Sequence, residues 1–282
     1  MIDSNPPRKI TIVGLGLIGG SIAAGLRLRS PESEICGVDF PERLNAEGAK
    51  RHTHSQVSVR DPRALQVALD ASDLCVLCAP VGVIVELIPQ ALQAADAVTD
   101  CGSTKRRIME SVAACSRASR FVAGHPMAGA AGGSLAEARA DLFEGRRWIV
   151  CEQQSDKDAH GKVSWLIEQL GAVEMSMSAD EHDKALALTS HTPQVLASVL
   201  LTLAKDQGAL ATGGPAFERC TQGAGANEAM WRDIFSSNAD EVAAALRSFS
   251  ARLSDVADGL EREDLEPVLA LLAAAGMSES DL

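Results

Sequence analysis

The sequence contains no tyrosine, although a chain of 282 residues ordinarily carries several, and aromatic residues make up only 3% of it. No apolar run is long enough to span a bilayer, which argues against an integral membrane protein. Residues 1–9 are polar and contain no apolar core of a signal peptide, so we expect a cytoplasmic protein.

Positive charge is also scarce. The 26 Lys and Arg residues are outnumbered by 38 Asp and Glu residues, and the formal net charge is −12. This excess argues against nucleic acid and anionic membranes as partners. An anionic substrate would need a local basic pocket, because the field of the whole molecule repels it.

Cysteine frameworks and metal-binding patterns are missing as well. The seven cysteines show no framework spacing. Cys75 and Cys78 form a C-x-x-C pattern inside an expected strand, where side chains three apart point to opposite faces. Buried apolar cysteines are therefore a better interpretation than a redox pair or a metal clamp. No cluster of His, Cys and acidic residues has metal-ligand spacing, so we expect no metal.

The remaining composition is typical of a globular protein with a large core, with 46% hydrophobic and 23% charged residues. In the first half of the chain, apolar runs alternate with helical stretches, which predicts a doubly wound parallel sheet. We expect strands at residues 10–13, 35–38, 74–78, 97–99, 121–123 and 148–151, and helices at residues 21–28, 62–69, 83–92 and 105–114.

A glycine-rich motif links the first expected strand to the first helix. Gly14 permits a tight turn, Gly16 lets a pyrophosphate approach bare backbone, and Gly19 lets the helix pack close to the sheet. Leu17 and Ile18 follow Gly16 and precede the helix expected at 21–28, and we expect them to contact the cofactor where backbone N–H groups and the helix dipole stabilise negative charge. The context of strand and helix favours a Rossmann-type dinucleotide site over a glycine-rich turn without a ligand.

The predicted dinucleotide is NAD rather than NADP. Asp39 ends the second expected strand, 20 residues after Gly19. A carboxylate there would accept hydrogen bonds from ribose hydroxyls and repel a 2′-phosphate. No arginine immediately follows it, and Arg43 is four residues on. Ala79 and Pro80, after the strand at 74–78, form a short apolar turn that could lie against the nucleotide.

From about residue 178 the chain becomes rich in alanine and leucine at helical spacing. Ser178 and Glu181 form a capping box after a possible last strand at 174–177. We therefore expect a dinucleotide-binding domain at 1–178 and an all-helical domain at 179–282. The stretch 195–201 is apolar on nearly all sides, so its own domain or a partner subunit must bury it. The clearest helices are expected at 195–204, 233–257 and 265–275, with a loop at 208–215.

Candidate catalytic residues follow the strands, where ligands bind to a doubly wound sheet. His125 is the best candidate, because imidazole takes a proton near neutral pH and Pro126 keeps its backbone extended. A structural histidine is the alternative. Ser103 could orient a substrate hydroxyl or the imidazole, contact the cofactor, or cap a helix. His191 is either a substrate ligand or a buried structural residue. The other histidines have polar neighbours and are expected at the surface: His52, His54, His160 and His182.

Six motifs occur along the chain in a fixed order. They are residues 14–21, Asp100-x-Gly102-Ser103-Thr104-Lys105, Gly124-His125-Pro126-Met127-Ala128-Gly129, Asp141-Leu142-Phe143-Glu144-Gly145, Ser190-His191-x-Pro193 and Met230-Trp231-Arg232-Asp233-Ile234. Over about residues 9 to 250, this series resembles the prephenate/arogenate dehydrogenases of tyrosine biosynthesis.

The resemblance implies an oxidative decarboxylation. The hydrogen on ring C4 leaves as hydride to the nicotinamide, the C4 hydroxyl gives its proton to a histidine, and carbon dioxide is lost as the ring becomes aromatic. His125 matches that histidine, and Ser103 matches a serine that assists its hydrogen bond. The helical domain of the family forms a homodimer. The missing tyrosine fits an enzyme made when tyrosine is scarce, with compositional drift as the alternative.

Two positions depart from the family pattern. Gln194 stands where the family motif Ser-His-x-Pro-His usually ends in histidine, and Gln222 replaces an arginine that binds a substrate carboxylate. An amide can hydrogen-bond a carboxylate but cannot neutralise it. The substrate could carry an amino group, as arogenate does, or another arginine could compensate. We expect His191, Gln194, Gln222 and Gly132 to bind substrate, and the compensating candidates are Arg146, Arg147, Arg219 and Arg232.

Two alternatives stay open. One is another NAD(P)-dependent dehydrogenase of this architecture, of the β-hydroxyacid or imine class, which usually carries a catalytic lysine on the helical domain. Lys184 and Lys205 lie in no motif of that kind. The other is a dinucleotide-sensing homologue without catalysis, which the substitutions at Gln194 and Gln222 leave possible.

Overall fold

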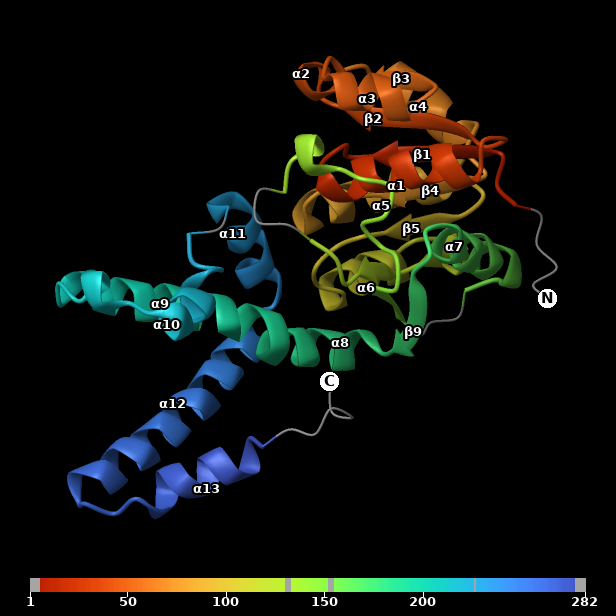
Figure 1. Ribbon diagram of the computed structural model, residues 1–282. Coiled ribbons are helices and arrows are strands. Elements are labelled where there is room, and N and C mark those ends of the chain that lie inside the picture. Colours follow the sequence, from red (N-terminus) through yellow and green to blue (C-terminus); the bar gives the residue numbers. More distant parts are fainter. Residues whose placement is uncertain (1–5, 130–132, 152–154, 226, 277–282) are drawn as a thin grey trace.

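The first part of the chain folds as a parallel sheet with helices on both faces (Figure 1). A computed structural model describes residues 6–129, 133–151, 155–225 and 227–276. The strand order β3-β2-β1-β4-β5-β6 is that of a Rossmann fold and confirms the predicted fold class. The strands are β1 (Lys9–Val13), β2 (Glu34–Asp39), β3 (Ser55–Ser58), β4 (Leu74–Leu77), β5 (Val98–Asp100) and β6 (Phe121–Val122).

Two apolar clusters fill the space between the sheet and its helices. Leu74 and Val76 face the cluster that includes α1 and α7, whereas Cys75 and Leu77 face the one that includes α4, α5 and α6. Burial on both faces explains why these strands are continuous apolar runs in the sequence. The helices of this part are α1 (Leu17–Arg29), α2 (Pro41–Leu44), α3 (Glu47–His52), α4 (Pro62–Asp70), α5 (Val81–Ala94), α6 (Arg106–Ala113) and α7 (Lys157–Gln169).

A second, three-stranded sheet follows, which the sequence did not predict. It contains β7 (Gly124–Pro126), β8 (Arg147–Cys151) and β9 (Val173–Met177), with β7 antiparallel and β9 parallel to β8. The strand expected at 148–151 therefore exists but lies outside the parallel sheet. The chain leaves that sheet at Ala123, whose carbonyl accepts a hydrogen bond from the amide of Cys151 at 2.9 Å.

The rest of the described chain is helical. The capping box at Ser178 and Glu181 is present and begins α8. The helix expected at 233–257 is interrupted at Asn238, whose φ of −139° ends α11 before α12 begins. The division into domains at 1–178 and 179–282 stays a prediction. The helices are α8 (Ala179–Leu186), α9 (Thr192–Asp206), α10 (Pro215–Thr221), α11 (Glu228–Ser237), α12 (Ala239–Glu261) and α13 (Glu266–Ala274).

One helical segment is longer than the sequence suggested. A π-helical stretch, Ala187–His191, joins α8 to α9. Among the described residues, the resulting helix Ala179–Asp206 is long and apolar enough to cross a membrane by length and composition alone, contrary to our expectation. Its first turns carry His182 and Asp183, both completely buried against the α/β part, which places that end of the helix inside the protein.

The helical part is fastened to the α/β part at helix N-termini. Asp233 of α11 accepts hydrogen bonds from the backbone N–H groups of Val81 and Gly82 at the start of α5. Thr104 also donates a hydrogen bond to Ser237, with 2.8 Å between the two hydroxyl oxygens. These contacts hold the carboxyl edge of the parallel sheet, where α5 and α6 begin, against the helical part.

Candidate active site

The glycine motif, Gly14 to Gly19, has the geometry of a dinucleotide-binding turn, which we call the cradle together with Asp39 and the turn after β4. Gly14 has a φ of +97°, and a Cβ there would lie 2.6 Å from the carbonyl oxygen of Cys78. A Cβ at Gly19 would lie 1.9 Å from the carbonyl oxygen of Gly14, so the helix can approach the strand only with glycine. A Cβ at Gly16 would have its nearest neighbour at 3.5 Å. The two ends of the turn therefore exclude any other residue, whereas a Cβ at its centre would make only ordinary van der Waals contacts.

The first turn of α1 presents its backbone to this open centre. Gly16 is the N-cap, and no side chain caps the helix. The amide of Leu17 donates to the carbonyl oxygen of Gly133 at 3.3 Å, and Ile18 follows half-buried. A helix N-terminus without a side-chain cap is a favourable place for a pyrophosphate.

Asp39 closes the second side of the cradle. It is 5% exposed, and its carboxylate accepts hydrogen bonds from the amides of Leu15 at 2.7 Å and Phe40 at 2.6 Å. Each carboxylate oxygen keeps lone-pair capacity for a ribose hydroxyl. The guanidinium of Arg43 lies 3.8 Å from the same carboxylate. These residues fit the adenosine ribose of NAD.

Ala79 and Pro80 stand on the opposite wall of the cradle. They follow β4 and precede α5, with Ala79 half-buried and Pro80 exposed at the helix N-cap. The carbonyl oxygen of Cys78, just before them, is the group that a side chain at Gly14 would meet. The structure thus brings the turn after β4 beside the glycine motif, as the sequence predicted for a doubly wound sheet.

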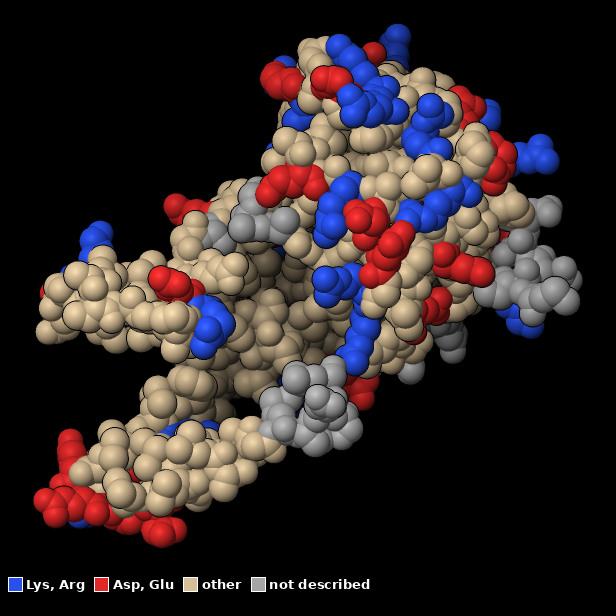
Figure 2. All heavy atoms as spheres, in the orientation of Figure 1, with Lys and Arg blue, Asp and Glu red and all other residues tan. Residues whose placement is uncertain are grey.

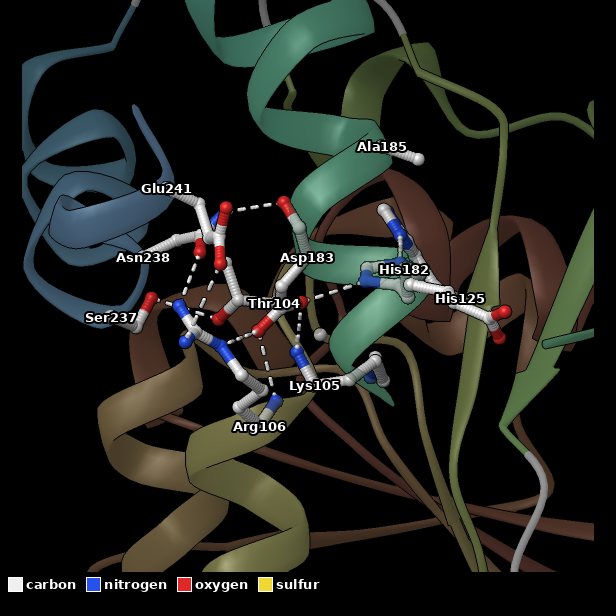
Figure 3. Close-up of polar contacts among 12 residues, drawn as sticks. Thr104, Lys105, Arg106, His125, His182, Asp183, Ala185, Ser237, Asn238 and Glu241 are labelled. Atoms are coloured by element: carbon white, nitrogen blue, oxygen red, sulfur yellow. Dashed lines mark hydrogen bonds and ion pairs between the residues drawn. The ribbon is translucent and has the colours of Figure 1, made fainter. Parts of the chain in front are cut away.

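His125 lies on β7 at the same edge and is hydrogen-bonded to a second histidine (Figure 3). The distance between Nδ1 of His125 and Nε2 of His182 is 2.8 Å, and Nδ1 of His182 lies 2.7 Å from Oδ1 of Asp183. Both His182 and Asp183 are completely buried. The expectation that His182 lies at the surface is therefore wrong, because α8 packs this face against the α/β part.

Asp183 also holds the start of α6. Its two carboxylate oxygens accept hydrogen bonds from the amides of Lys105 at 2.7 Å and Arg106 at 2.9 Å. Burial opposes ionisation, but the hydrogen bonds from His182 and from these two amides outweigh it, so the pKa of Asp183 is below its usual value. Asp183 is therefore an ionised acceptor at neutral pH.

This acceptor fixes the tautomers of both imidazoles. An ionised carboxylate cannot donate, so Nδ1 of His182 carries the hydrogen and its Nε2 is an acceptor. Nδ1 of His125 must then donate, which leaves Nε2 of His125 without a proton. Burial, and next the charges of His182 and Lys105, hold the pKa of His125 well below its usual value. His125 is therefore a neutral imidazole with a free basic nitrogen.

A buried ion pair fixes the backbone next to His125. Lys105 and Asp100 are both completely buried and in contact. Nζ of Lys105 also donates to the carbonyl oxygen of Gly124 at 2.7 Å, while the carboxylate of Asp100 accepts from the amides of Gly102 at 2.8 Å and Gly124 at 3.1 Å. The pair therefore ties the end of β5 and the turn before α6 to the residue preceding His125.

Ser103 has no hydrogen-bond partner in the part of the chain that the structure describes. Nδ1 of His125, the atom that a supporting serine could occupy, is bonded to His182. The helix-capping alternative for Ser103 is not observed either, since Asp183 accepts the first amides at α6. A contact of Ser103 with substrate or cofactor stays a prediction.

His191 is buried at the end of the π-helical stretch, 1% exposed. Its Nδ1 lies 3.4 Å from Nδ2 of Asn238, and the Trp231 ring meets it edge-on with 6.0 Å between centroids. Burial, the largest influence, lowers the pKa of His191 to about 4, so it is neutral. π-Helical turns are frequent at functional sites, and this one turns His191 toward α11 and α12.

The two glutamines that depart from the family pattern belong to one cluster. Nε2 of Gln194 donates to the carbonyl oxygen of Gly223 at 2.8 Å, and Gln222 is the adjacent residue, exposed at the end of α10. Gly132 lies outside the described residues. Of the candidate arginines, Arg232 is paired with Glu228 at 2.6 Å.

Sequence reasoning missed His182, Asp183, Trp231 and Asn238 as parts of this region. A signal for the first two was present. His182 and Leu186, like Asp183 and Ala187, stand four residues apart in a helix whose start was predicted, and all four are buried. That spacing marks one inward face, on which a polar pair must have partners.

Comparison with known families gives a match over nearly the whole chain. The pattern described as "Prephenate dehydrogenase, nucleotide-binding domain" matches residues 22–176, and "Prephenate dehydrogenase, dimerization domain" matches residues 178–274. A prephenate dehydrogenase of Lactococcus lactis is 31% identical over 274 residues, covering 93% of this chain and 73% of the relative. A cyclohexadienyl dehydrogenase of Zymomonas mobilis is 26% identical, covering 91% and 90%.

A solved structure agrees in fold and in extent. The crystal structure of prephenate dehydrogenase from Aquifex aeolicus, in complex with hydroxyphenyl propionate and NAD+, superimposes with a TM-score of 0.83. It is 26% identical, and the match covers 95% of each chain. From these matches, the chain belongs to the prephenate dehydrogenase family.

Proposed function

We propose that this protein oxidatively decarboxylates prephenate, arogenate or a close cyclohexadienyl analogue, with NAD as oxidant, in tyrosine biosynthesis. The observation that carries the proposal is the hydrogen-bond chain from Asp183 through His182 to His125, which leaves a basic nitrogen at the carboxyl edge of the sheet. Membership of the family supports the reaction class.

The residues that would hold the cofactor are those of the cradle. The open backbone at Gly16 and the first turn of α1 suit the pyrophosphate, and Asp39 suits the free 2′-hydroxyl of NAD. NAD, when bound, supplies the hydride acceptor for the hydrogen on ring C4. Arg43 beside Asp39 is the one feature here that would suit NADP, so the preference needs direct measurement.

His125 provides the acid–base chemistry of the proposed reaction. Its Nε2 takes the proton of the C4 hydroxyl as the C4 hydrogen leaves with its electron pair, so that C4 becomes a carbonyl carbon. The electron pair of the bond to the departing carboxylate then enters the ring. The ring becomes aromatic, and His125 returns the proton to the phenolate oxygen. His182 and Asp183 hold the imidazole in the basic tautomer before the proton transfer, and Nδ1 of His125 goes on donating to His182 while Nε2 carries the proton.

The second end of the substrate would meet the cluster around Gln194. Oε1 of Gln194 is an acceptor, and Gln222 adds a second amide at the position where the family has arginine. Figure 2 shows a hollow between the α/β part and the helical part, with mostly uncharged residues at its centre and Lys and Arg along its α/β edge. Amides donate and accept hydrogen bonds, which suits a zwitterionic side chain. We therefore favour arogenate or another aminated analogue over the doubly anionic prephenate.

The assembly proposed for this enzyme is a homodimer in the cytoplasm, formed through the helical part. Large apolar side chains of α9 and α13 are exposed in the single chain, among them Val199 at 47%, Leu203 at 55% and Leu272 at 65%. The family pattern that matches this part is described as a dimerization domain. A second copy of the chain is the occupant that best suits this apolar surface.

The decisive test is a panel of purified protein with prephenate and arogenate, each with NAD+ and NADP+, following cofactor reduction and release of carbon dioxide. We expect turnover with NAD+, and a kcat/KM for arogenate above that for prephenate. Binding of NAD+ without turnover of any cyclohexadienyl substrate would favour a dinucleotide-sensing homologue. Turnover only with a β-hydroxyacid or an imine would favour the other dehydrogenase class.

A further inference from the structure

Two thiols lie together at the carboxyl edge of the parallel sheet. Cys78 follows β4 and Cys101 follows β5, and the sheet register pairs the residues just before them, Leu77 with Asp100. The amide of Cys101 donates to the carbonyl oxygen of Leu77 at 2.9 Å, which continues the pairing by one residue. The two Sγ atoms are 3.6 Å apart.

This arrangement allows a disulfide to form without moving the strands apart. Neighbouring strands lie about 4.8 Å apart, and disulfides need Cα atoms about 4.4–6.8 Å apart and sulfurs about 2.05 Å apart. Closing the 3.6 Å between the sulfurs to that bond length needs side-chain rotation together with a small shift of the two turns that carry them. Cys75 differs, because it faces the opposite side of β4 and is completely buried, and burial raises its pKa to about 12.

The two thiols have different roles in such a reaction. Both residues are half-buried, so a small oxidant can reach them. The hydrogen bond to Cys101, and then burial, raise the pKa of Cys78 well above its usual value, so Cys78 keeps its proton and donates to the sulfur of Cys101. A donated hydrogen bond stabilises a thiolate, and the thiolate is the reactive form of cysteine. Because the hydrogen bond runs from Cys78 to Cys101, we assign Cys101 as the attacking thiol and Cys78 as the resolving one.

We propose that Cys78 and Cys101 form a peroxide-sensitive dithiol that closes to a disulfide when nucleotide is absent, and that the disulfide weakens NAD binding. The Cys101 thiolate attacks a peroxide oxygen, so an S–O bond forms, the O–O bond breaks and hydroxide leaves. The Cys78 sulfur then attacks the Cys101 sulfur, so the S–S bond forms, the S–O bond breaks and the leaving hydroxide takes the Cys78 proton to become water. A dithiol reductant reverses the reaction.

The link to nucleotide binding comes from the two turns that carry the sulfurs. The backbone carbonyl of Cys78 is the group that Gly14 accommodates by lacking a Cβ, with 2.6 Å to the Cβ position. Cys78 directly precedes Ala79, and Cys101 precedes Gly102 in the turn that leads to α6. Drawing the sulfurs together therefore pulls on two walls of the cradle. By linkage, bound NAD would hold these two turns in place and oppose formation of the disulfide.

The experiment uses the Cys220→Ser protein, because Cys220 is exposed and could cross-link two molecules. Six of the seven cysteines remain. The protein is treated with hydrogen peroxide, alkylated and mapped by mass spectrometry, and its Kd for NAD+ is measured by calorimetry. We expect a Cys78–Cys101 linkage, loss of two titratable thiols and a Kd for NAD+ raised about tenfold, which corresponds to about 1.4 kcal/mol. Dithiothreitol should restore the Kd, and prior addition of NAD+ should slow the linkage.

Variants separate this effect from general oxidation damage. In Cys78→Ser and Cys101→Ser proteins, peroxide should leave the Kd for NAD+ at the value of the same untreated variant. The matched control is Cys115→Ser, a half-buried cysteine bonded to the carbonyl oxygen of Ser111, which should respond as the parent does. Absence of the linkage, a linkage with unchanged Kd, or equal loss of affinity in Cys101→Ser would each overturn the proposal. None of these readouts requires turnover, so they stand apart from the proposed reaction.

Discussion

His125 is the residue on which the proposed chemistry depends most directly. Replacing it by asparagine removes the base while keeping a polar side chain, so kcat should fall by about 10²–10⁴, the usual contribution of a general base. The Kd for NAD+ should change little, because the cradle lies on other elements. The control is His160→Asn on α7, a half-exposed histidine near Glu174. Steady-state kinetics and calorimetry check both values, and near-normal turnover would remove His125 from the mechanism.

His182 is a positioning residue, and its effect can be separated from loss of folding. In His182→Leu, Nδ1 of His125 loses its acceptor, so the basic tautomer is no longer imposed and kcat should fall by about tenfold or more with little change in KM. In His182→Gln the amide oxygen can stand close to the place of Nε2, and we expect part of the activity to return. Equal activity of the two variants would show that the hydrogen bond to His125 has no catalytic role.

Gln222 is the residue at which substrate choice should be adjustable. A Gln222→Arg variant should shift preference toward prephenate, because a desolvated charge-assisted hydrogen bond is typically worth about 1.5–3 kcal/mol. The measurement is the ratio of kcat/KM for prephenate and arogenate in both proteins, with Gln207→Arg at the end of α9 as the control for added charge. A wild type that strongly prefers prephenate, with no change in the variant, would mean that another group binds the carboxylate.

At the scale of elements, α8 stabilises α6 through a single carboxylate. Asp183→Ala leaves the amides of Lys105 and Arg106 without acceptors and should lower the free energy of unfolding by about 1–3 kcal/mol at neutral pH. The pKa of Asp183 is lowered in the folded state, so this stabilisation is complete above the unfolded pKa of about 4 and is lost as the pH falls through the lower folded pKa.

Urea unfolding of the two proteins, near pH 7 and again near pH 4 and below, checks this dependence. The difference between wild type and Asp183→Ala should shrink only at the acidic end. Asp180→Ala is the control, since Asp180 stands exposed in the first turn of the same helix. A difference that does not vary with pH would mean that the carboxylate is not ionised in the folded protein.

Elements were predictable from sequence where burial leaves a local pattern. The strand Leu74–Leu77 is apolar throughout because helices cover both of its faces. The edge strand Ser55–Ser58 is short and half-exposed, so its sequence carries no such run. His182 was predicted at the surface because its neighbour Glu181 is polar and exposed. It is buried because it bonds to His125, which is 57 residues away in the sequence. The cradle could be predicted because its glycine spacing, flanking strand and helix form a local sequence motif, and the histidine chain could not because it joins distant segments that share no motif.

At the scale of the whole molecule, the apolar surface of the helical part sets the expected assembly. The wild type should be a dimer by light scattering at micromolar concentration. Leu203→Glu, on α9, should shift it toward monomer because a buried, unpaired carboxylate is costly. Leu28→Glu in α1, where the side chain is 68% exposed on the α/β part, should leave the dimer unchanged. A monomeric wild type would reject the proposed dimer.

The carboxylates of Asp183 and Asp233 reach from the helical part to the first turns of α6 and α5. Separation of the two parts would break the hydrogen bonds of these carboxylates. The backbone N–H groups at the starts of α5 and α6 would lose their acceptors, and Asp183 and Asp233 would lose their donors. Such hinge motion is therefore expensive, and the molecule should behave as one rigid block during a catalytic cycle. Substrate and carbon dioxide would then enter and leave the site without separation of the two parts. The rate of turnover would be limited by the chemical step and by diffusion of substrate and products, and not by separation of the α/β part from the helical part.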